Sequence, residues 1–397
     1  MLRSLLKTRY LYYGGSIVVS RGLEYIVLFF AAHFLAKEDY GELEFYKKAV
    51  EIGSNILAFG FPALILSYTK SDESKIYFYW LSVFFVLGLG LLLLVAGIFY
   101  PIAILLVLTM VFYALFFSGG IAQSFQIVHL GSNFASIYKI VVSVLFYGSV
   151  LGLVNFWEIK GQAYLFPSVL LLPLALLYAY MDFRRVGIVW DKVSKYWQLF
   201  KKLLLSSFTL VVSNFANLLF LYTDILVIKW LSSSANLEIA DFSFALNVAG
   251  ILLIISMTLI QVDIEKLKVN AAFLHALNIK IVVLTLIVSV LLIVGYYVLI
   301  THFFEQFGAT FWLFLIILAG KFCLTVSNLF GTYLVILKKF TLNLNINLVF
   351  LLANIVSCIL GYQAFGLIGL AVSSSVMLAL RLGVLMFFNY KAVGYKL

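Results

Sequence analysis

Long, uninterrupted apolar runs constrain this chain more than any other feature of its sequence. Residues 91–95, for example, read Leu-Leu-Leu-Leu-Val without a polar residue between them. A helix needs about 20 apolar residues to cross a bilayer core about 30 Å thick. A transmembrane barrel strand needs only about ten, and apolar and polar residues alternate along it. Because these runs do not alternate, they favour membrane-spanning helices.

The composition agrees with this interpretation and excludes several classes of protein. Hydrophobic residues make up 64% of the 397 residues and charged residues 11%, against about 25% charged in soluble domains. A water-soluble enzyme, a nucleic-acid-binding domain and a disordered chain are therefore excluded. Cys323 and Cys358 both lie in apolar runs, so no disulfide framework is expected.

The sequence also lacks the motifs of common catalytic and metal sites. The four histidines are not spaced as metal ligands, and no Gly-rich phosphate-binding loop of the GxxxxGK[ST] type is present. We therefore expect no metal, no cofactor and no enzymatic activity.

Twelve segments are long and apolar enough to span a membrane. They predict an all-α integral membrane protein with about twelve transmembrane helices. Their six-and-six layout suggests two lobes of six helices each with parallel topology. The segments are 14–36, 47–69, 76–98, 101–125, 134–156, 163–183, 203–228, 239–262, 279–301, 309–336, 341–362 and 365–388.

The distribution of Lys and Arg predicts the orientation in the membrane. With the N-terminus inside, nineteen of the 27 basic residues fall in inside segments and five in outside segments. Both termini of this multi-pass protein are therefore expected in the cytoplasm. The longest segment between spans runs over 184–202 and divides the chain into an N-terminal bundle (1–183) and a C-terminal bundle (203–397).

Charged residues inside spans are costly, at about 2.5–3.5 kcal/mol each on insertion scales, and they usually face a protein interior or a cavity. In the first span, Arg21 and Glu24 share a helical face. They form either an internal ion pair or a cavity cation beside a titratable carboxylate. In the second span, Glu51 shares a face with Asn55, and Lys47 one turn earlier is a candidate partner for Glu51.

Polar stripes also mark the second half of the chain. Asn214, Asn217 and Asp224 share a face of the seventh span, with Lys229 as a candidate partner for Asp224. Lys321 and Asn328 lie on one face of the tenth span with Thr325 and Thr332. Arg381 lies in the last span on the face of Ser374, while Asn343, Asn347, Asn354 and Ser357 in the eleventh span suit either a cavity or interhelical hydrogen bonds.

A cationic cavity is expected to attract an anionic cargo, because Arg and Lys are the usual ligands of phosphate groups. The candidate residues of the cargo site are Arg21, Lys321, Arg381, Asn328, Asn214 and Asn217.

The opening of the chain resembles a known family. Tyr40-Gly41 ends a short loop after the first span, Gly53 lies in the second, and Gly60-Phe61-Pro62-Ala63 follows. With Asp224 in the seventh span, these residues are similar to bacterial polysaccharide-unit flippases, the O-antigen and capsule translocases. Multidrug and toxin extruders and the lipid II flippase belong to the same superfamily. The chain departs from the family's pattern at Ala240-Asp241-Phe242, where a Gly and later a Tyr are common.

The resemblance implies two six-helix bundles around a central cavity, placed in the bacterial inner membrane. It implies an undecaprenyl-diphosphate-linked oligosaccharide as cargo, carried by alternating access. It implies membrane lipids and other polysaccharide assembly proteins as partners, no nucleic acid, and coupling to H⁺ or Na⁺. Glu24, Glu51 and Asp224 are the candidate coupling carboxylates, with Glu24 first because it lies deepest in a span. A drug or small-molecule antiporter of the same fold remains an alternative, and so does a membrane glycan polymerase or transferase.

Overall fold

The computed structural model describes residues 8–67, 72–117, 119–156, 160–186, 190–269 and 273–393. The regular elements in these ranges are all helices. Residues 187–189 of the expected linker lie outside the described residues. The fold class predicted from the apolar runs is therefore confirmed as an all-helical membrane fold.

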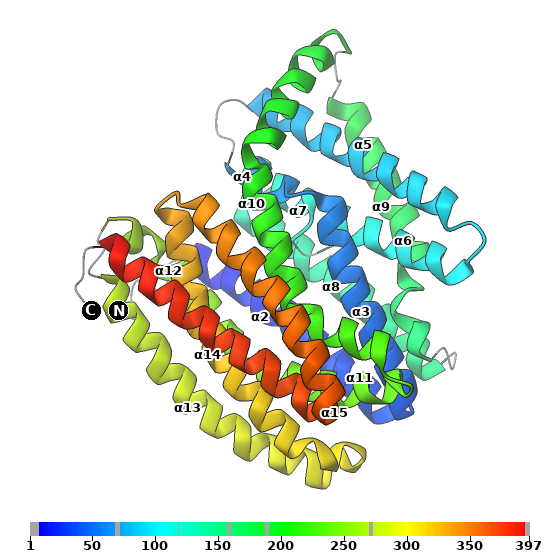
Figure 1. The fold of residues 1–397 in the computed structure, drawn as a ribbon. Helices are drawn as coiled ribbons and strands as arrows, with labels where there is room; N and C mark the ends of the chain where they lie inside the picture. The colour runs from blue at the N-terminus through cyan, green and yellow to red at the C-terminus, as the bar shows by residue number, and fades with distance from the viewer. Residues whose placement is uncertain are drawn as a thin grey trace. The chain divides into compact units, whose positions relative to one another are not determined.

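The α-helices and two short 3-10 helices follow one another in chain order (Figure 1). They are α2 (Thr8–Phe34), α3 (Lys37–Ala58), α4 (Phe61–Ser67), α5 (Asp72–Ala96), α6 (Pro101–Leu115), α7 (Ile121–His129), α8 (Ser132–Phe156), η1 (Gly161–Tyr164), α9 (Pro167–Val186), α10 (Trp190–Leu231), α11 (Ala235–Gly250), α12 (Leu252–Val269), α13 (Phe273–His302), η2 (Glu305–Thr310), α14 (Phe311–Ile336) and α15 (Phe340–Val393).

Each expected span coincides with helical structure, but several boundaries differ from the expectation. The segment 47–69 divides into α3 and α4, because Phe59 and Gly60 adopt positive φ angles of 42° and 71°. The last two segments form the single element α15, which is interrupted by non-helical backbone at Phe365 and Gly366. Among the described residues, eight helices are long and apolar enough to cross a membrane. The number twelve stays a prediction.

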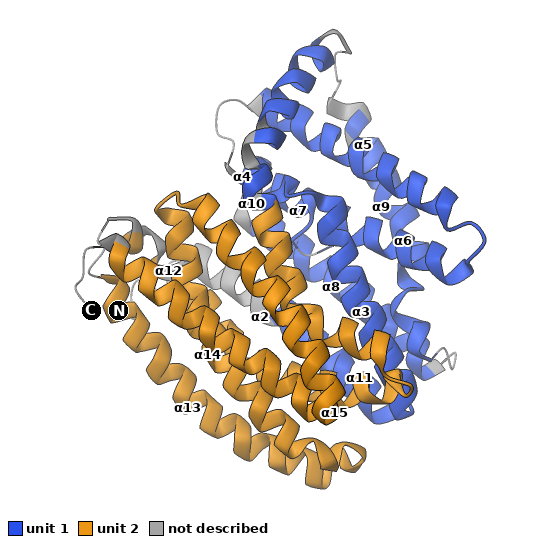
Figure 2. Ribbon diagram, in the orientation of Figure 1, with its two compact units in different colours: residues 1–211 blue, residues 212–397 orange. Residues whose placement is uncertain are grey.

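The chain divides into two compact units (Figure 2), residues 1–211 and residues 212–397. The division falls inside α10, which is one continuous helix from Trp190 to Leu231. Most of the expected linker 184–202 therefore belongs to α9 and α10, and no Gly or Pro interrupts α10.

Unit 1 has an aromatic core in which α6, α8 and η1 meet. Phe112 stacks on Phe146 with ring centroids 5.9 Å apart, and Tyr113 forms a hydrogen bond with Tyr164. Thr109 on α6 donates to the Leu165 carbonyl at 3.0 Å and shares a 2.7 Å hydrogen bond with Ser168. These polar contacts fix the start of α9 against α6 inside an otherwise apolar core.

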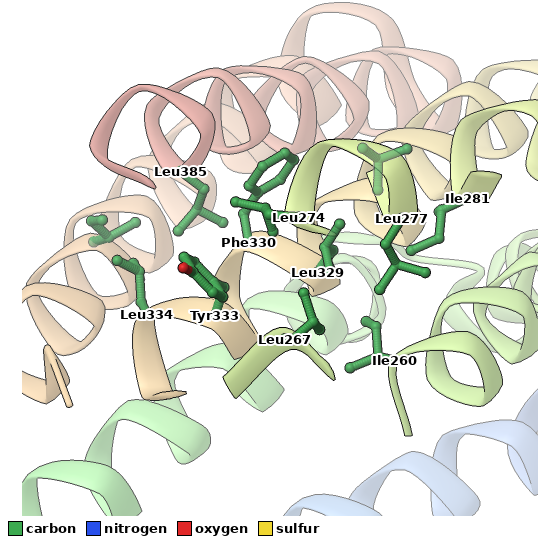
Figure 3. Close-up of a cluster of buried hydrophobic side chains, with 12 residues drawn as sticks. Ile260, Leu267, Leu274, Leu277, Ile281, Leu329, Phe330, Tyr333, Leu334 and Leu385 are labelled. Carbon is green, nitrogen blue, oxygen red and sulfur yellow. The ribbon is translucent and has the colours of Figure 1, made fainter. Parts of the chain in front are cut away.

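Unit 2 is built around α14, which contacts α11, α12, α13 and α15. A cluster of buried side chains fills the space between α12, α13, α14 and α15 (Figure 3), including Leu277, Phe330 and Leu385. The outer side of α13 is apolar and exposed at Val283, Leu286, Val290 and Val294. An exposed apolar face on a helix of this length is suited to contact with lipid.

Candidate functional site

A polar seam runs through unit 2 where α10 forms hydrogen bonds with both halves of α15. We define it by Ser213, Asn217 and Asp224 on α10, Asn347, Asn354 and Cys358 in the first half of α15, and Ser374 and Arg381 in the second half. Three hydrogen-bonded pairs between α10 and the first half have the same sequence separation of 134 residues. This constant separation means that the two segments run parallel and in one fixed register.

Arg381 is the principal cation of the polar seam. Its residue is 6% exposed, and its Nη2 donates to Asn217 Oδ1 at 2.7 Å and to Asn347 Oδ1 at 2.9 Å. The guanidinium carbon lies 5.3 Å from the centre of the Phe220 ring. Its Nη1 is buried and has no hydrogen-bond partner among the described residues.

The partners of Arg381 are therefore neutral amides and an aromatic ring. The amides are themselves fixed, since Asn347 Nδ2 donates to Ser213 Oγ at 2.9 Å and Asn343 Nδ2 donates to the same oxygen at 3.1 Å. A buried guanidinium normally has a carboxylate partner, and no ion pair to Arg381 occurs within the described part of the chain. Arg381 therefore keeps a buried positive charge and a buried N–H group that has no acceptor among the described residues.

Asp224 lies on α10 two turns after Asn217 and is 5% exposed. Ser374 Oγ donates to its Oδ2 at 3.1 Å, and the Cys358 thiol donates to its Oδ1 at 3.4 Å. Lys321 on α14, itself 8% exposed, acts electrostatically on this carboxylate. The sequence pointed to Lys229 as the partner of Asp224, but Lys229 donates to Asn236 at 2.9 Å.

In the stripe on α14, Lys321 and Thr325 are buried, and Asn328 and Thr332 are half-buried. Thr325 donates to the carbonyl of Lys321 in its own helix at 2.7 Å. Asn328 donates to Ser256 on α12 at 3.3 Å, which is an interhelical contact. Asn214, in contrast, is exposed and is not part of the polar seam.

Unit 1 contains a second concentration of charge, which we call the charge cluster. It consists of Arg21 and Glu24 on α2 and Lys47, Lys48 and Glu51 on α3. Arg21 Nη1 lies 2.7 Å from Glu24 Oε2, and Lys47 Nζ lies 2.8 Å from Glu24 Oε1. Lys48 Nζ lies 3.6 Å from Glu51 Oε2.

The charge cluster corrects one expected pairing. Lys47 binds Glu24 across the α2–α3 contact, and it is Lys48 that pairs with Glu51. The close ion pair of Lys47 is thus with the buried carboxylate of α2, while Glu51 acts on Lys47 electrostatically. Asn55 is exposed and donates to the Glu51 carbonyl at 2.8 Å.

Sequence reasoning missed Ser213, Cys358 and Lys48 as members of these two sites. A sign of the charge cluster was present, since Glu44, Lys47, Lys48 and Glu51 recur at the spacing of one helical face. Within the described residues, no three side chains of His, Cys, Asp or Glu gather as a metal site.

The chain was compared with protein families and with known proteins. The model of the family described as "Polysaccharide biosynthesis protein" matches residues 7–264. No curated protein matches the chain.

Two solved structures have a similar fold. One is the lipid II flippase MurJ in an inward closed conformation, with a TM-score of 0.65 and 16% identity over 95% of this chain and 87% of that one. The other is an inward-facing MATE-family multidrug resistance transporter of the MOP superfamily, with a TM-score of 0.55 and 13% identity over 94% of each chain. At these identities the likeness concerns the fold.

Proposed function

This chain belongs to the polysaccharide biosynthesis protein family, and on that premise we propose that it is a flippase. Its cargo would be a lipid-diphosphate-linked oligosaccharide. The protein would carry this cargo across the bacterial cytoplasmic membrane by alternating access. The fold match to a protein named as a lipid II flippase supports a lipid-linked cargo.

Arg381 is the observation that carries this proposal. It is a buried cation with neutral hydrogen-bond partners and a free Nη1. Guanidinium groups bind phosphate oxygens in bidentate geometry, and such charge-assisted bonds are stronger than neutral ones. A diphosphate would give Arg381 the negative charge and the acceptor that the described residues do not supply.

A binding experiment with a short analogue tests this assignment. The purified protein in detergent should bind farnesyl diphosphate but not farnesol, which lacks the diphosphate. Arg381→Gln should weaken binding by about tenfold or more, because it removes the charge that the diphosphate neutralises. Lys229→Gln is the matched control, since Lys229 is an exposed cation of the same unit.

The alternative function is a drug antiporter, which is favoured by the fold match to a multidrug transporter. Such a protein would bind an organic cation such as ethidium, and binding would not require Arg381. Ethidium binding without farnesyl diphosphate binding would replace the flippase proposal with this one.

For ion coupling we propose Asp224 in place of Glu24. Glu24 is held by two cations at 2.7 and 2.8 Å, so protonating it would leave both without their buried partner. Asp224 accepts its hydrogen bonds from a hydroxyl and a thiol, and Lys321 acts on it electrostatically. Protonation of Asp224 therefore disrupts less of its surroundings, which suits a group that alternately binds and releases a proton.

A further inference from the structure

Glu24 in the charge cluster holds two cations, and their surroundings differ sharply. The side chain of Lys47 is 2% exposed and that of Arg21 is 52% exposed, while that of Glu24 between them is 11% exposed. One carboxylate thus has a buried counterion on one oxygen and an accessible counterion on the other.

The two ion pairs are not equivalent in cost. Breaking the Lys47–Glu24 pair would leave the buried Lys47 ammonium without its close carboxylate partner. Proteins avoid unpaired buried charges because their desolvation is costly. The Arg21–Glu24 pair is less costly to break, because the Arg21 side chain is 52% exposed and Lys47 stays beside Glu24. Lys47 would still neutralise Glu24 after Arg21 had left.

The backbone around Arg21 is fixed while its side chain is accessible. Ser20, the preceding residue, is buried and shares a 2.8 Å hydrogen bond with Ser143 on α8. Lys48 has its own carboxylate in Glu51 at 3.6 Å. Arg21 is therefore the cation of the charge cluster that is free to exchange Glu24 for another anion.

We propose that Lys47 is the permanent counterion of Glu24, and that it thereby releases Arg21 to bind the anionic group of the cargo. This inference rests on the proposed flippase function and assigns a positioning role to Lys47, which does not itself touch the cargo. Glu24 acts as the resting partner that holds Arg21 in place until the anion arrives.

The proposal makes an unusual prediction for Lys47. In Lys47→Met, Arg21 becomes the sole close counterion of Glu24 and is retained there, so binding of farnesyl diphosphate should weaken about tenfold although Arg21 is intact. In the double variant Lys47→Met/Glu24→Gln, the carboxylate no longer competes for Arg21. Binding should then return to within about threefold of the parent.

Arg21→Gln completes the set. It should weaken farnesyl diphosphate binding about tenfold or more while the thermal unfolding midpoint stays close to that of the parent, because Lys47 still neutralises Glu24. Lys160→Gln is the matched control, since Lys160 is an exposed cation 3.5 Å from Asp39 in the same unit. Its binding should equal that of the parent.

The outcomes separate this inference from the function on which it rests. If the parent fails to bind farnesyl diphosphate, the flippase proposal and this inference are both overturned. If the parent binds and Arg381→Gln weakens binding, but the double variant stays as weak as Lys47→Met, only the role of Lys47 is overturned. A purely structural Lys47 would give that second result. An Arg21→Gln variant that binds farnesyl diphosphate as tightly as the parent would also overturn the inference.

Discussion

Gly361→Ala should destabilise unit 2, because the two halves of α15 approach each other backbone to backbone at this residue. A Cβ atom on Gly361 would lie 2.6 Å from the carbonyl oxygen of Gly369 and would also overlap the Ser373 hydroxyl. A carbonyl oxygen in a helix cannot rotate away, so the two halves must separate. Neither glycine has a positive φ angle, so the cost comes from packing alone.

The magnitude follows from the cost of overpacking, about 1–3 kcal/mol for a forced methyl group. For a unit of this size each kcal/mol lowers the unfolding midpoint by about 2–4 °C, so we expect a fall of about 2–12 °C. Separating the two halves should also weaken the hydrogen bonds to Asp224, since its two donors, Cys358 and Ser374, come from opposite halves of α15.

Thermal unfolding of the purified protein in detergent, followed by tryptophan fluorescence, measures this effect. Gly383→Ala is the matched control, because it lies in the same helix and an added Cβ there meets nothing within 4 Å. Its midpoint should equal that of the parent or lie slightly above it. Equal midpoints for both alanine variants would refute the close approach of the two halves.

Three further predictions address other parts of the molecule. Thr109→Val should lower the free energy of unfolding by about 1–3 kcal/mol, because it leaves the buried Ser168 hydroxyl without one partner; chemical denaturation measures the change, and no loss would remove Thr109 from the unit 1 core. Cysteines introduced at the exposed positions Ser194 and Ser233 should react from opposite membrane faces, the first from the cytoplasm, because they flank the span Val211–Leu231; labelling of both from outside would contradict the orientation. In vesicles, Asp224→Asn should abolish the dependence of transport on a proton gradient and Glu24→Gln should keep it; the reverse result would return the coupling role to Glu24.

Periodicity predicted the helices and their polar faces well, because both are local properties of the chain. Arg21 and Glu24 were expected to share a face, and they pair at 2.7 Å. Pairing between helices was harder to predict. Lys47 and Lys229 were matched with carboxylates nearby in sequence, whereas the structure pairs Lys47 with a carboxylate on another helix. Sequence distance favours local partners, and a buried residue takes the partner that tertiary packing presents.

Helix boundaries showed the same limit. The interruptions at Phe59–Gly60 and Phe365–Gly366 lie inside or beside apolar runs. Apolar composition indicates which segments can lie in the bilayer, but it carries little information on where the backbone of a helix breaks. Gly60 and Gly366 were visible in the sequence, but Gly53, Gly88 and Gly90 lie within helices, so glycine alone did not identify the breaks.

The shared separation of 134 residues between α10 and the first half of α15 also restricts how the gene can change length. Deleting one residue between Ser213 and Asp224 would turn the later part of α10 by about 100°, and every pair beyond the deletion would lose its partner together. A compensating deletion in α15 would have to fall at the matching position. Point substitutions can therefore accumulate along this seam one at a time, while insertions and deletions are expected to be confined to the loops outside it.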